Sequence, residues 1–422
     1  MVAVVKDSHT GCFSPGLRQF RLIDYLFKEK KEQHSAMNLL QALKSVVRQL
    51  SNHRASLFSV PVDQQRTFLG SLLEPKDLLE RSYDQYLCQM QLEQPLIRTG
   101  YQLAALLLFP IYRFRLRRQT AVSAGGPAEA VFAYASGDSI LPASLRKEFP
   151  AVRQVEDFQN SLSLTQEDTA FLRELTNRYP TAFYFRFKCM VKLAMYRSLY
   201  ETYHPKAIIV SEEYSYTSSF LTEYCRRLGV EHINVMHGDK LYYIRDSFFH
   251  FDRCYIWDEY YRKLFCALRA EPTQFRVELP PSMQPWEKTA TPPEVDLTYY
   301  LQGESPEQLR RIAAALHMLQ VRGMVIAIRP HPRYTPPESM RFFQDFLVED
   351  CSISIEQSIL RTKRAVSRYS TVLLQASING VAVVIDDLTE PERFAQLRSL
   401  RYIMLDKPHG LLSALLQEES PT

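Results

Sequence analysis

The sequence predicts an α/β protein with two Rossmann-like domains and a helical N-terminal region, and three observations carry this prediction. From about residue 128 onward, short strand-like runs alternate with helical runs, which is typical of a parallel sheet. The segment 279–296 holds five prolines and interrupts the alternation, which then restarts. The length of 422 residues also exceeds what one compact core usually holds. We therefore expect two sheets joined by a proline-rich linker.

The N-terminal region differs in pattern from the rest of the chain. Apolar residues recur at helical spacing between about 15 and 120, for example in MNLLQALKSVVRQL. The run SAGGP (123–127) then indicates a linker. We predict a helical region over 1–125, a first Rossmann-like domain over 126–285 and a second over 286–422.

Individual elements follow from periodicity and from capping residues. In the first domain, strands are predicted at 131–136, 151–155, 207–211, 232–236, 253–257 and 275–279. A helix after Thr217 should stop at Gly229. In the second domain, strands are predicted at 296–301, 324–329, 364–368 and 381–386, and helices at 339–347 and 371–379. Ser305 and Gln308 form a capping-box pattern at the start of a further helix.

Composition excludes several classes of protein. The formal net charge of +4 is small for this length and does not indicate nucleic-acid binding. The seven cysteines are scattered and never spaced as CxxC, which favours reduced thiols over a disulfide framework or a zinc site. The N-terminus MVAVVKDSHTGCF lacks the pattern of a signal peptide. We therefore expect a cytoplasmic protein.

The most apolar run, YQLAALLLFPIY (101–112), is directly followed by RFRLRR. It is shorter than the ~20 residues that a membrane span needs. One interpretation is a peripheral contact of 101–118 with the inner membrane surface, because clustered arginines bind anionic headgroups. The other is a buried helix that ends at Pro110, with the arginines as its solvated tail.

Ligands of open parallel sheets bind beyond the carboxyl ends of the strands, and unusual residues follow several predicted strands. In IAIRPHPRY, Arg329, His331 and Arg333 come directly after a strand, and two prolines stiffen their turn. Three groups that can hold an anion suit a phosphate or diphosphate. The alternative interpretation is a basic surface loop.

A second group lies at the start of the predicted helix 371–379. Ser367, Ser370 and Thr371 place hydroxyls beside a helix N-terminus, where the dipole and unpaired N–H groups favour an anion. Simple capping by Ser370 is the alternative. Because both groups follow strands of the same domain, we predict one phosphate site from the two.

The run VMHGDK follows the strand HINVM in the first domain. His237 is a candidate catalytic residue, and Gly238, Asp239 and Lys240 are candidate substrate contacts. The alternative is a tight turn with a histidine that is satisfied in the core.

Carboxylates follow two other strands of the first domain. Glu212 and Glu213 end the strand AIIVS, and Asp138 follows the strand at 131–136. Any of the three could be the general base that deprotonates an acceptor hydroxyl. For each one alone, a surface ion pair or a helix cap is the alternative.

The combination of strand–MHGDK, strand–RPHPR and SRYSTVLLQASINGVAVV resembles GT-B glycosyltransferases of bacterial surface polysaccharides. It is most similar to those that use CMP-activated sugars, namely sialyl-, polysialyl- and Kdo-transferases, and to the related CDP-glycerol glycerophosphotransferases. The resemblance covers roughly 205–390. It implies that His331 contacts the nucleotide phosphate, that Ser370 and Thr371 cradle it, and that Glu213 is the leading base candidate.

The resemblance implies a nucleotide-sugar donor in the second domain and a glycan or glycolipid acceptor in the first. No DxD motif is present, which argues against a metal-dependent GT-A mechanism but says little within GT-B. We expect a nucleotide-sugar substrate and neither a metal nor another cofactor. The predicted activity is transfer of a sugar, with inversion, to a hydroxyl of a cell-surface glycan. The alternatives are a CDP-polyol phosphotransferase of the same layout and a non-catalytic nucleotide- or sugar-binding partner in glycan assembly. A UDP-sugar epimerase shares the two-domain pattern.

Overall fold

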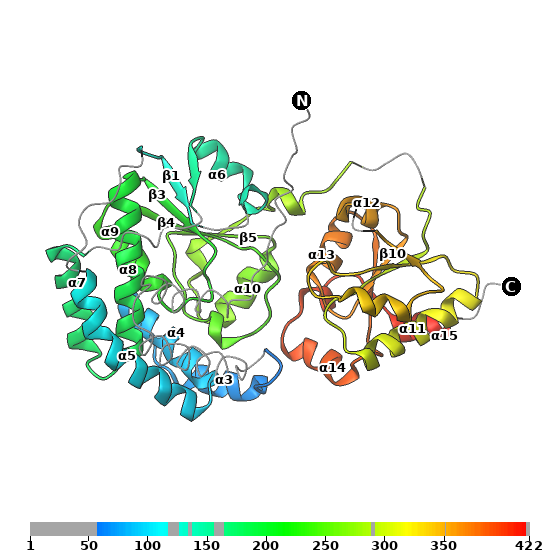
Figure 1. The fold of residues 1–422 in the computed structure, drawn as a ribbon, viewed down its shortest axis with the longest axis horizontal. Coiled ribbons are helices and arrows are strands. Elements are labelled where there is room, and N and C mark those ends of the chain that lie inside the picture. The colour runs from blue at the N-terminus through cyan, green and yellow to red at the C-terminus, as the bar shows by residue number, and fades with distance from the viewer. Residues whose placement is uncertain are drawn as a thin grey trace, which may run out of the picture. The chain divides into compact units, whose positions relative to one another are not determined.

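The structure is a computed structural model that describes residues 57–116, 126–133, 137–155, 164–287, 292–350 and 352–418. It divides into two compact units (Figure 1). The first runs to His237 and resumes over Tyr243–Pro281, and the second contains Gly238–Tyr242 and the chain from Ser282 onward. The division after Pro281 falls within the proline-rich segment 279–296. The helices described before residue 117 belong to the first unit.

The first unit is built on a six-stranded sheet in the order β2-β1-β3-β4-β5-β6. Every neighbouring pair is parallel. The strands are β1 (Ala130–Phe132), β2 (Val152–Gln154), β3 (Ala207–Val210), β4 (Glu231–Val235), β5 (Arg253–Ile256) and β6 (Phe275–Val277). All four residues of β3 are buried, as expected for a central strand whose two faces are both covered. Each strand predicted for this domain corresponds to one of these six, and residues 134–136 of the first predicted strand lie outside the described residues.

The first unit also contains eight described α-helices. They are α3 (Val62–Ser71), α4 (Leu78–Leu92), α5 (Pro95–Leu116), α6 (Ala143–Glu148), α7 (Gln166–Arg178), α8 (Phe183–Tyr203), α9 (Ser218–Arg227) and α10 (Glu259–Ala267). Helices α5 and α7 pack against α8, and α4 packs against α9 (Figure 1). The predicted helix stop is confirmed, because α9 ends just before Gly229, whose φ is +69°.

The apolar run 101–112 belongs to α5, and the interpretation that this helix ends at Pro110 is wrong. Helix α5 continues to Leu116. A proline removes one backbone hydrogen bond from a helix, but Tyr112 and Leu116 pack on the buried residues Met190 and Val191 of α8 and hold the last turns in place. Arg117, Arg118 and the apolar pattern at 37–50 lie outside the described residues. Within the described ranges, no helix combines the length and the hydropathy that a membrane span requires.

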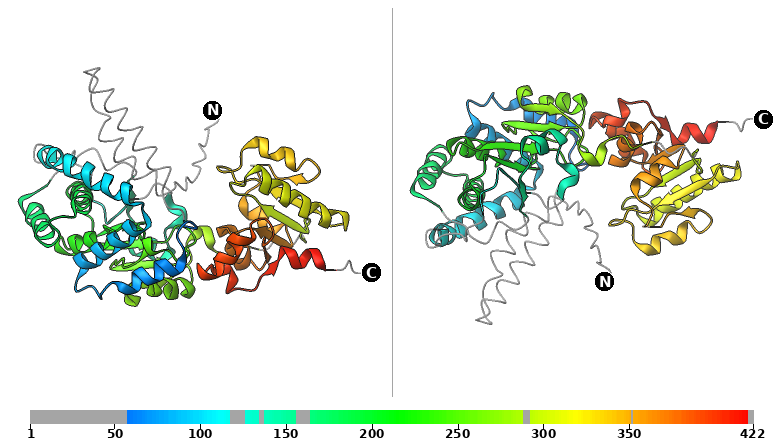
Figure 2. Two further views of the ribbon diagram at one scale, coloured as in Figure 1. Left: turned by 90° about the horizontal axis from the view of Figure 1, so that it is seen from below. Right: turned by 90° about the horizontal axis from the view of Figure 1, so that it is seen from above.

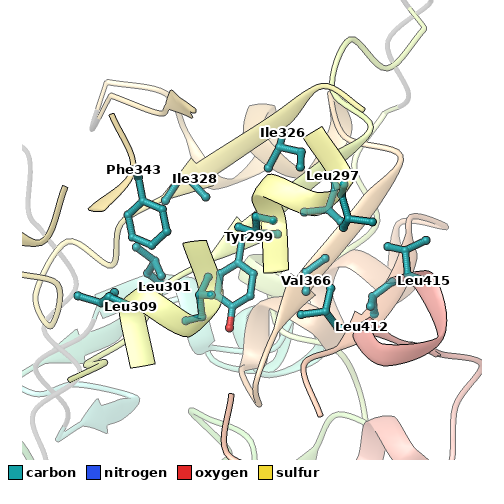
Figure 3. Close-up of a cluster of buried hydrophobic side chains, with 14 residues drawn as sticks. Leu297, Tyr299, Leu301, Leu309, Ile326, Ile328, Phe343, Val366, Leu412 and Leu415 are labelled. Atoms are coloured by element: carbon teal, nitrogen blue, oxygen red, sulfur yellow. The ribbon is translucent and has the colours of Figure 1, made fainter. Parts of the chain in front are cut away.

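The second unit holds another six-stranded parallel sheet, in the order β12-β11-β10-β7-β8-β9. Its strands are β7 (Leu297–Tyr300), β8 (Ile326–Arg329), β9 (Leu347–Val348), β10 (Arg364–Ser367), β11 (Ala382–Ile385) and β12 (Gly410–Leu411). Figure 3 shows the core on one face of this sheet, where Leu297, Tyr299 and Ile328 pack with Leu309. The fold class is therefore α/β with two Rossmann-like units, as predicted.

The helices of the second unit are α11 (Pro306–Val321), α12 (Ile355–Leu360), α13 (Thr371–Ile378), α14 (Pro391–Ser399) and α15 (Leu412–Gln417). Figure 2 gives two further views of the ribbon. The capping box of α11 is confirmed, with Ser305 N donating to Gln308 Oε1 at 2.8 Å.

The helix predicted at 339–347 is wrong. A 3-10 helix spans Pro337–Phe342, and Leu347–Val348 then pair with β8 as a short parallel strand. Phe343 is fully buried in the core of the second unit. Burial of this ring and pairing with the edge of β8 outweigh the local helix propensity of the segment.

A buried histidine lies in the core of the first unit. His232 of β4 is fully buried, with Tyr196 Oη 2.9 Å from Nε2 and Thr222 Oγ1 2.8 Å from Nδ1. Burial lowers the pKa of His232 to about 4, although the charge of Asp252 acts in the opposite direction. His232 is thus neutral in the folded protein over a pH range in which an unfolded histidine is charged.

The depressed pKa predicts acid sensitivity of the first unit. Between about pH 6.5, the ordinary value, and pH 4, the unfolded state binds one more proton at His232 than the folded state. We expect this group to lower the free energy of unfolding by about 1.4 kcal/mol per pH unit as the pH falls through this window. Urea unfolding at several pH values should show that His232→Gln loses this part of the slope. His204→Asn is the control, because His204 is exposed in the same unit and has a φ of +44° that asparagine tolerates.

Candidate functional site

A histidine, a serine and a carboxylate meet at the carboxyl ends of β3 and β4. These strands are parallel neighbours, so their ends reach the same edge of the sheet. Ser211 Oγ lies 2.5 Å from His237 Nδ1, and Glu213 Oε1 lies 3.8 Å from the same nitrogen. The hydroxyl and the carboxylate therefore both face one ring nitrogen of His237.

His237 lies closer to the surface than Glu213. The side chain of His237 is 14% exposed and that of Glu213 only 1%. Asn234 of β4 fixes the acidic residues, since its Nδ2 donates to Glu213 Oε2 at 3.2 Å and its Oδ1 accepts from the backbone N–H of Glu212 at 2.8 Å. The carboxylate of Glu213 thus lies behind the imidazole.

The neighbouring carboxylate has a different partner. Glu212 accepts two hydrogen bonds from Lys192 Nζ of α8, at 2.7 and 3.1 Å, and both side chains are mostly buried. For Glu212, the alternative interpretation of an ion pair is therefore present in the structure. Glu212 and Glu213 have divergent environments although they are adjacent in sequence.

Three polar side chains of α4 hold the loop that follows β3. Ser82 Oγ donates to the carbonyl of Tyr216 at 2.5 Å, Gln85 Nε2 to that of Glu213 at 3.0 Å, and Gln89 Nε2 to that of Tyr214 at 2.5 Å. Spacings of three and four residues place these donors on one helix face. Sequence reasoning missed all three, as well as Ser211, Asn234 and Lys192, because no local pattern marks them.

Removal of a donor from α4 should loosen this loop. Gln85 is fully buried and also donates to the carbonyl of Arg245 at 3.0 Å. We expect Gln85→Ala to lower the free energy of unfolding by about 1–3 kcal/mol, because buried carbonyls lose their donor. Urea unfolding measures this loss. Gln91→Ala is the matched control, because Gln91 is exposed on the same helix, and an equal loss in both variants would contradict the prediction.

The third predicted carboxylate, Asp138, lies in the 3-10 helix Gly137–Ile140 that follows β1. Strand β1 is a neighbour of β3 in the sheet, so this segment belongs to the same edge as Glu213. The side chain of Asp138 lies outside what the structure describes. Its role as a base stays a prediction.

In the second unit, the turn after β8 is organised around His331. The ring Nδ1 accepts the backbone N–H groups of Arg333 at 3.1 Å and of Tyr334 at 3.3 Å. In the neutral ring, Nε2 then carries the proton and is a hydrogen-bond donor. Burial lowers the pKa of His331, and the charge of Arg333 lowers it further. His331 is therefore suited to donate to an anion as a neutral group.

Hydrogen bonds join this turn to the start of α13. Thr335 Oγ1 accepts from His331 N at 2.9 Å and donates to the carbonyl of Gln302 at 2.7 Å. The side chain of Gln302 in turn donates to the carbonyl of Tyr369, the residue before the N-cap of α13. The loops after β7, β8 and β10 thus form one connected surface, and the two elements of the predicted phosphate site lie together.

The other residues predicted for this site differ in their surroundings. Arg329 pairs with buried Glu349 at 2.9 Å and donates to the carbonyl of Ile353. Ser367 is buried and donates to the carbonyl of Tyr300 at 2.9 Å. Both side chains therefore stabilise the second unit itself, and their contact with a phosphate stays a prediction.

Arg333 is exposed, whereas Ser370 and Thr371 are half-buried. Ser370 caps α13, with Val372 N donating to its Oγ at 3.4 Å. Simple capping by Ser370, the alternative interpretation, is thus present, and an additional contact with an anion stays a prediction. The side chains that suit an anionic ligand are His331, Arg333, Ser370 and Thr371.

The remaining predicted substrate contacts, Gly238, Asp239 and Lys240, are grouped with the second unit. Asp239 Oδ1 accepts the backbone N–H of Lys240 at 2.7 Å. Burial and then the charge of Asp239 raise the pKa of Tyr402, whose hydroxyl accepts from Ser370 N at 3.1 Å. A Cβ on Gly238 would meet no described atom within 4 Å.

Metal ligands are not gathered in the described part of the chain. No group of three His, Cys, Asp or Glu side chains that could hold a metal ion occurs among the residues that the structure describes. Metal-independent chemistry stays a prediction.

No family model matches the chain, and a search of curated proteins finds no match. Among solved structures, a variant of the wall teichoic acid polymerase TagF soaked with CDPG is similar, with a TM-score of 0.42 and 11% identity over 77% of this chain and 88% of that chain. A putative UDP-N-acetylglucosamine 2-epimerase from Listeria monocytogenes has a TM-score of 0.38 and 12% identity over 71% of this chain and 92% of that chain. The UDP-N-acetylglucosamine 2-epimerase from Rickettsia bellii has a TM-score of 0.38 and 11% identity over 62% of this chain and 79% of that chain. These likenesses assign neither an activity nor a substrate to this chain.

Proposed function

We propose that the chain is a GT-B-type transferase that moves a sugar from a nucleotide donor, a CMP-sugar in the first place, to a hydroxyl of a cell-surface glycan or glycolipid. One observation supports this proposal above the others. Gln302 and Thr335 join the His331 turn to the start of α13, so that a neutral donor and a helix N-terminus lie side by side. Metal-independent transfer is part of the proposal.

In this proposal, the second unit stabilises the leaving phosphate. As the bond between the anomeric carbon and the donor phosphate breaks, negative charge grows on the phosphate oxygens. The Nε2–H group of His331, the positive charge of Arg333 and the N-terminal dipole of α13 stabilise that charge. The hydroxyls of Ser370 and Thr371 add donors at the same place.

In this proposal, the first unit activates the acceptor hydroxyl. His237 accepts the proton of the acceptor hydroxyl at Nε2, and the freed oxygen forms a bond to the anomeric carbon with inversion. Ser211 and Glu213 face Nδ1, and the carboxylate stabilises the imidazolium that results. Glu213, the leading base candidate from the sequence, is in this proposal a positioning residue behind His237.

A nucleotide panel tests the proposal. At a hundredfold excess over Kd, a ligand that binds only the folded state stabilises it by about 2.7 kcal/mol. We expect CMP, CDP and their sugars to raise Tm above the values with UDP and GDP. His331→Ala should abolish this shift and lower turnover by roughly 10²–10³, whereas His317→Ala on the exposed face of α11 should change neither.

The same panel distinguishes the alternatives. Turnover of CDP-glycerol or CDP-ribitol, and not of CMP-sugars, would identify the polyol-phosphate transferase. Conversion of a UDP-sugar without any acceptor would identify an epimerase. A nucleotide shift that persists undiminished in His331→Ala would refute the role of the turn.

Substitutions in the first unit test the base. His237→Ala should lower turnover by about 10²–10⁴, the usual contribution of a general base, and leave the nucleotide shift unchanged. Glu213→Gln keeps the size of the side chain and removes its charge, so we expect a smaller loss and an altered pH profile of kcat. Glu212→Gln is the control for a neighbouring carboxylate that pairs with Lys192. Full turnover in His237→Ala would rule out this base, and binding without turnover in the wild type would indicate a non-catalytic partner.

A further inference from the structure

Helix α5 presents an apolar face to the outside of the first unit. Leu103 is 56% exposed, Leu107 70% and Phe114 55%, and Leu106 and Ile111 are similarly exposed. Their spacing places them on one side of the helix, opposite the residues that pack on α8. A contiguous exposed apolar face of this kind marks an interaction surface.

A small pocket borders this face, between α5, α7 and α8. It has a volume of about 110 Å³, and Phe109, Met190, Thr169 and Thr176 contribute to its lining. A single water needs roughly 10–15 Å³ on this measure, so the pocket has room for a group of several atoms. Two arginines, Arg113 and Arg173, complete the charged part of the lining, and no carboxylate belongs to it.

The two arginines of the pocket form no ion pair with described residues. Within the described ranges, neither Arg113 nor Arg173 takes part in an ion pair. A third arginine, Arg186, lies with its guanidinium 5.3 Å from the ring centroid of Phe109. Burial lowers the pKa of Arg186, and the charge of Arg113 lowers it further. This region therefore attracts an anion.

The apolar face and the pocket meet along α5. Arg113 comes seven residues after Leu106 and three after Pro110, so it lies on the border of the apolar face. Helix α5 carries no acidic residue over Pro95–Leu116. A free phosphate would account for the arginines alone, and a second apolar surface would account for the leucines alone. A molecule that has an anionic group next to hydrocarbon accounts for both.

We propose that this surface binds a membrane of anionic phospholipids, with the α5 face in the interfacial layer and a headgroup phosphate in the pocket beside Arg113 and Arg173. An amphipathic helix of this kind buries its apolar side about 5–10 Å into the boundary between headgroups and acyl chains. Arginine suits the phosphate, since its planar group donates two parallel hydrogen bonds. The inference does not depend on the proposed transfer reaction.

Flotation of the full chain with vesicles tests this inference. We expect binding to vesicles that contain phosphatidylglycerol, and markedly weaker binding to pure phosphatidylcholine. The double variant Leu103→Glu/Leu107→Glu should abolish binding to both. Arg113→Gln/Arg173→Gln should weaken binding to the anionic vesicles by about fivefold per charge and leave binding to phosphatidylcholine unchanged.

Control variants lie on α11 of the second unit. Val321 is 75% exposed and Arg311 is a surface residue, so Val321→Glu and Arg311→Gln match the chemical changes on α5. Both should bind vesicles as the wild type does. Urea unfolding and the nucleotide shift should be the same in all these variants, which separates this experiment from the test of the transferase.

Three results would overturn the inference. The first is absence of flotation with anionic vesicles, and the second is flotation that the α5 leucine variant leaves unchanged. The third is a dimer in solution that Leu103→Glu/Leu107→Glu dissociates while vesicles are not bound, because the face would then join two copies of the chain. Equal binding of the arginine double variant and the wild type to anionic vesicles would remove the phosphate pocket from the proposal.

Discussion

Backbone carbonyls at the carboxyl ends of the two sheets are paired with side-chain donors, and the conformation of the loops at each candidate site depends on which side chains supply them. In the first unit, Ser82, Gln85 and Gln89 of α4 pair with the carbonyls of the loop after β3. In the second unit, Thr335 and Gln302 pair with carbonyls of the loops after β7 and β10. A buried carbonyl without a donor costs about 1–3 kcal/mol, so each loop is held in one conformation. These bonds hold the backbone of Glu213 in the first unit and of His331 in the second.

Hydrogen bonds with Asn234 also give two adjacent glutamates different positions. Asn234 binds the backbone of Glu212 and the side chain of Glu213, and the two side chains then point to different partners. Lys192 neutralises Glu212, whereas Glu213 lies behind His237. Two identical residues thereby have different surroundings, since Glu212 is in an ion pair and Glu213 lies where, in the proposed reaction, it would stabilise charge on the imidazole.

The sequence predicted what depends on local periodicity and missed what depends on distant contacts. Strand–helix alternation sufficed for both sheets, except for β9 and β12, which are two residues long and carry no pattern. Helix 339–347 was wrong because burial of Phe343 and pairing with β8 override propensity. The strand-end rule singled out His237 and His331, which follow β4 and β8 in the structure, and their roles stay predictions. It did not find Gln85, which lies 128 residues before the carbonyl of Glu213, because only the folded chain brings that donor to the loop.

Helices α4 and α5 both depart from the usual arrangement of polar residues outside and apolar residues inside. Helix α4 buries Ser82 and Gln85 completely, whereas α5 exposes Leu107 by 70%. A buried polar residue and an exposed apolar face are the informative departures from a protein's normal composition. The first is explained within the chain, because the buried side chains donate to the loop behind His237. The second finds no such explanation among the described residues, and two exposed arginines, Arg113 and Arg173, line the pocket beside it. In the two proposals above, one helical region would serve two surfaces, with α4 holding the loop behind His237 and α5 facing the headgroup layer of a membrane.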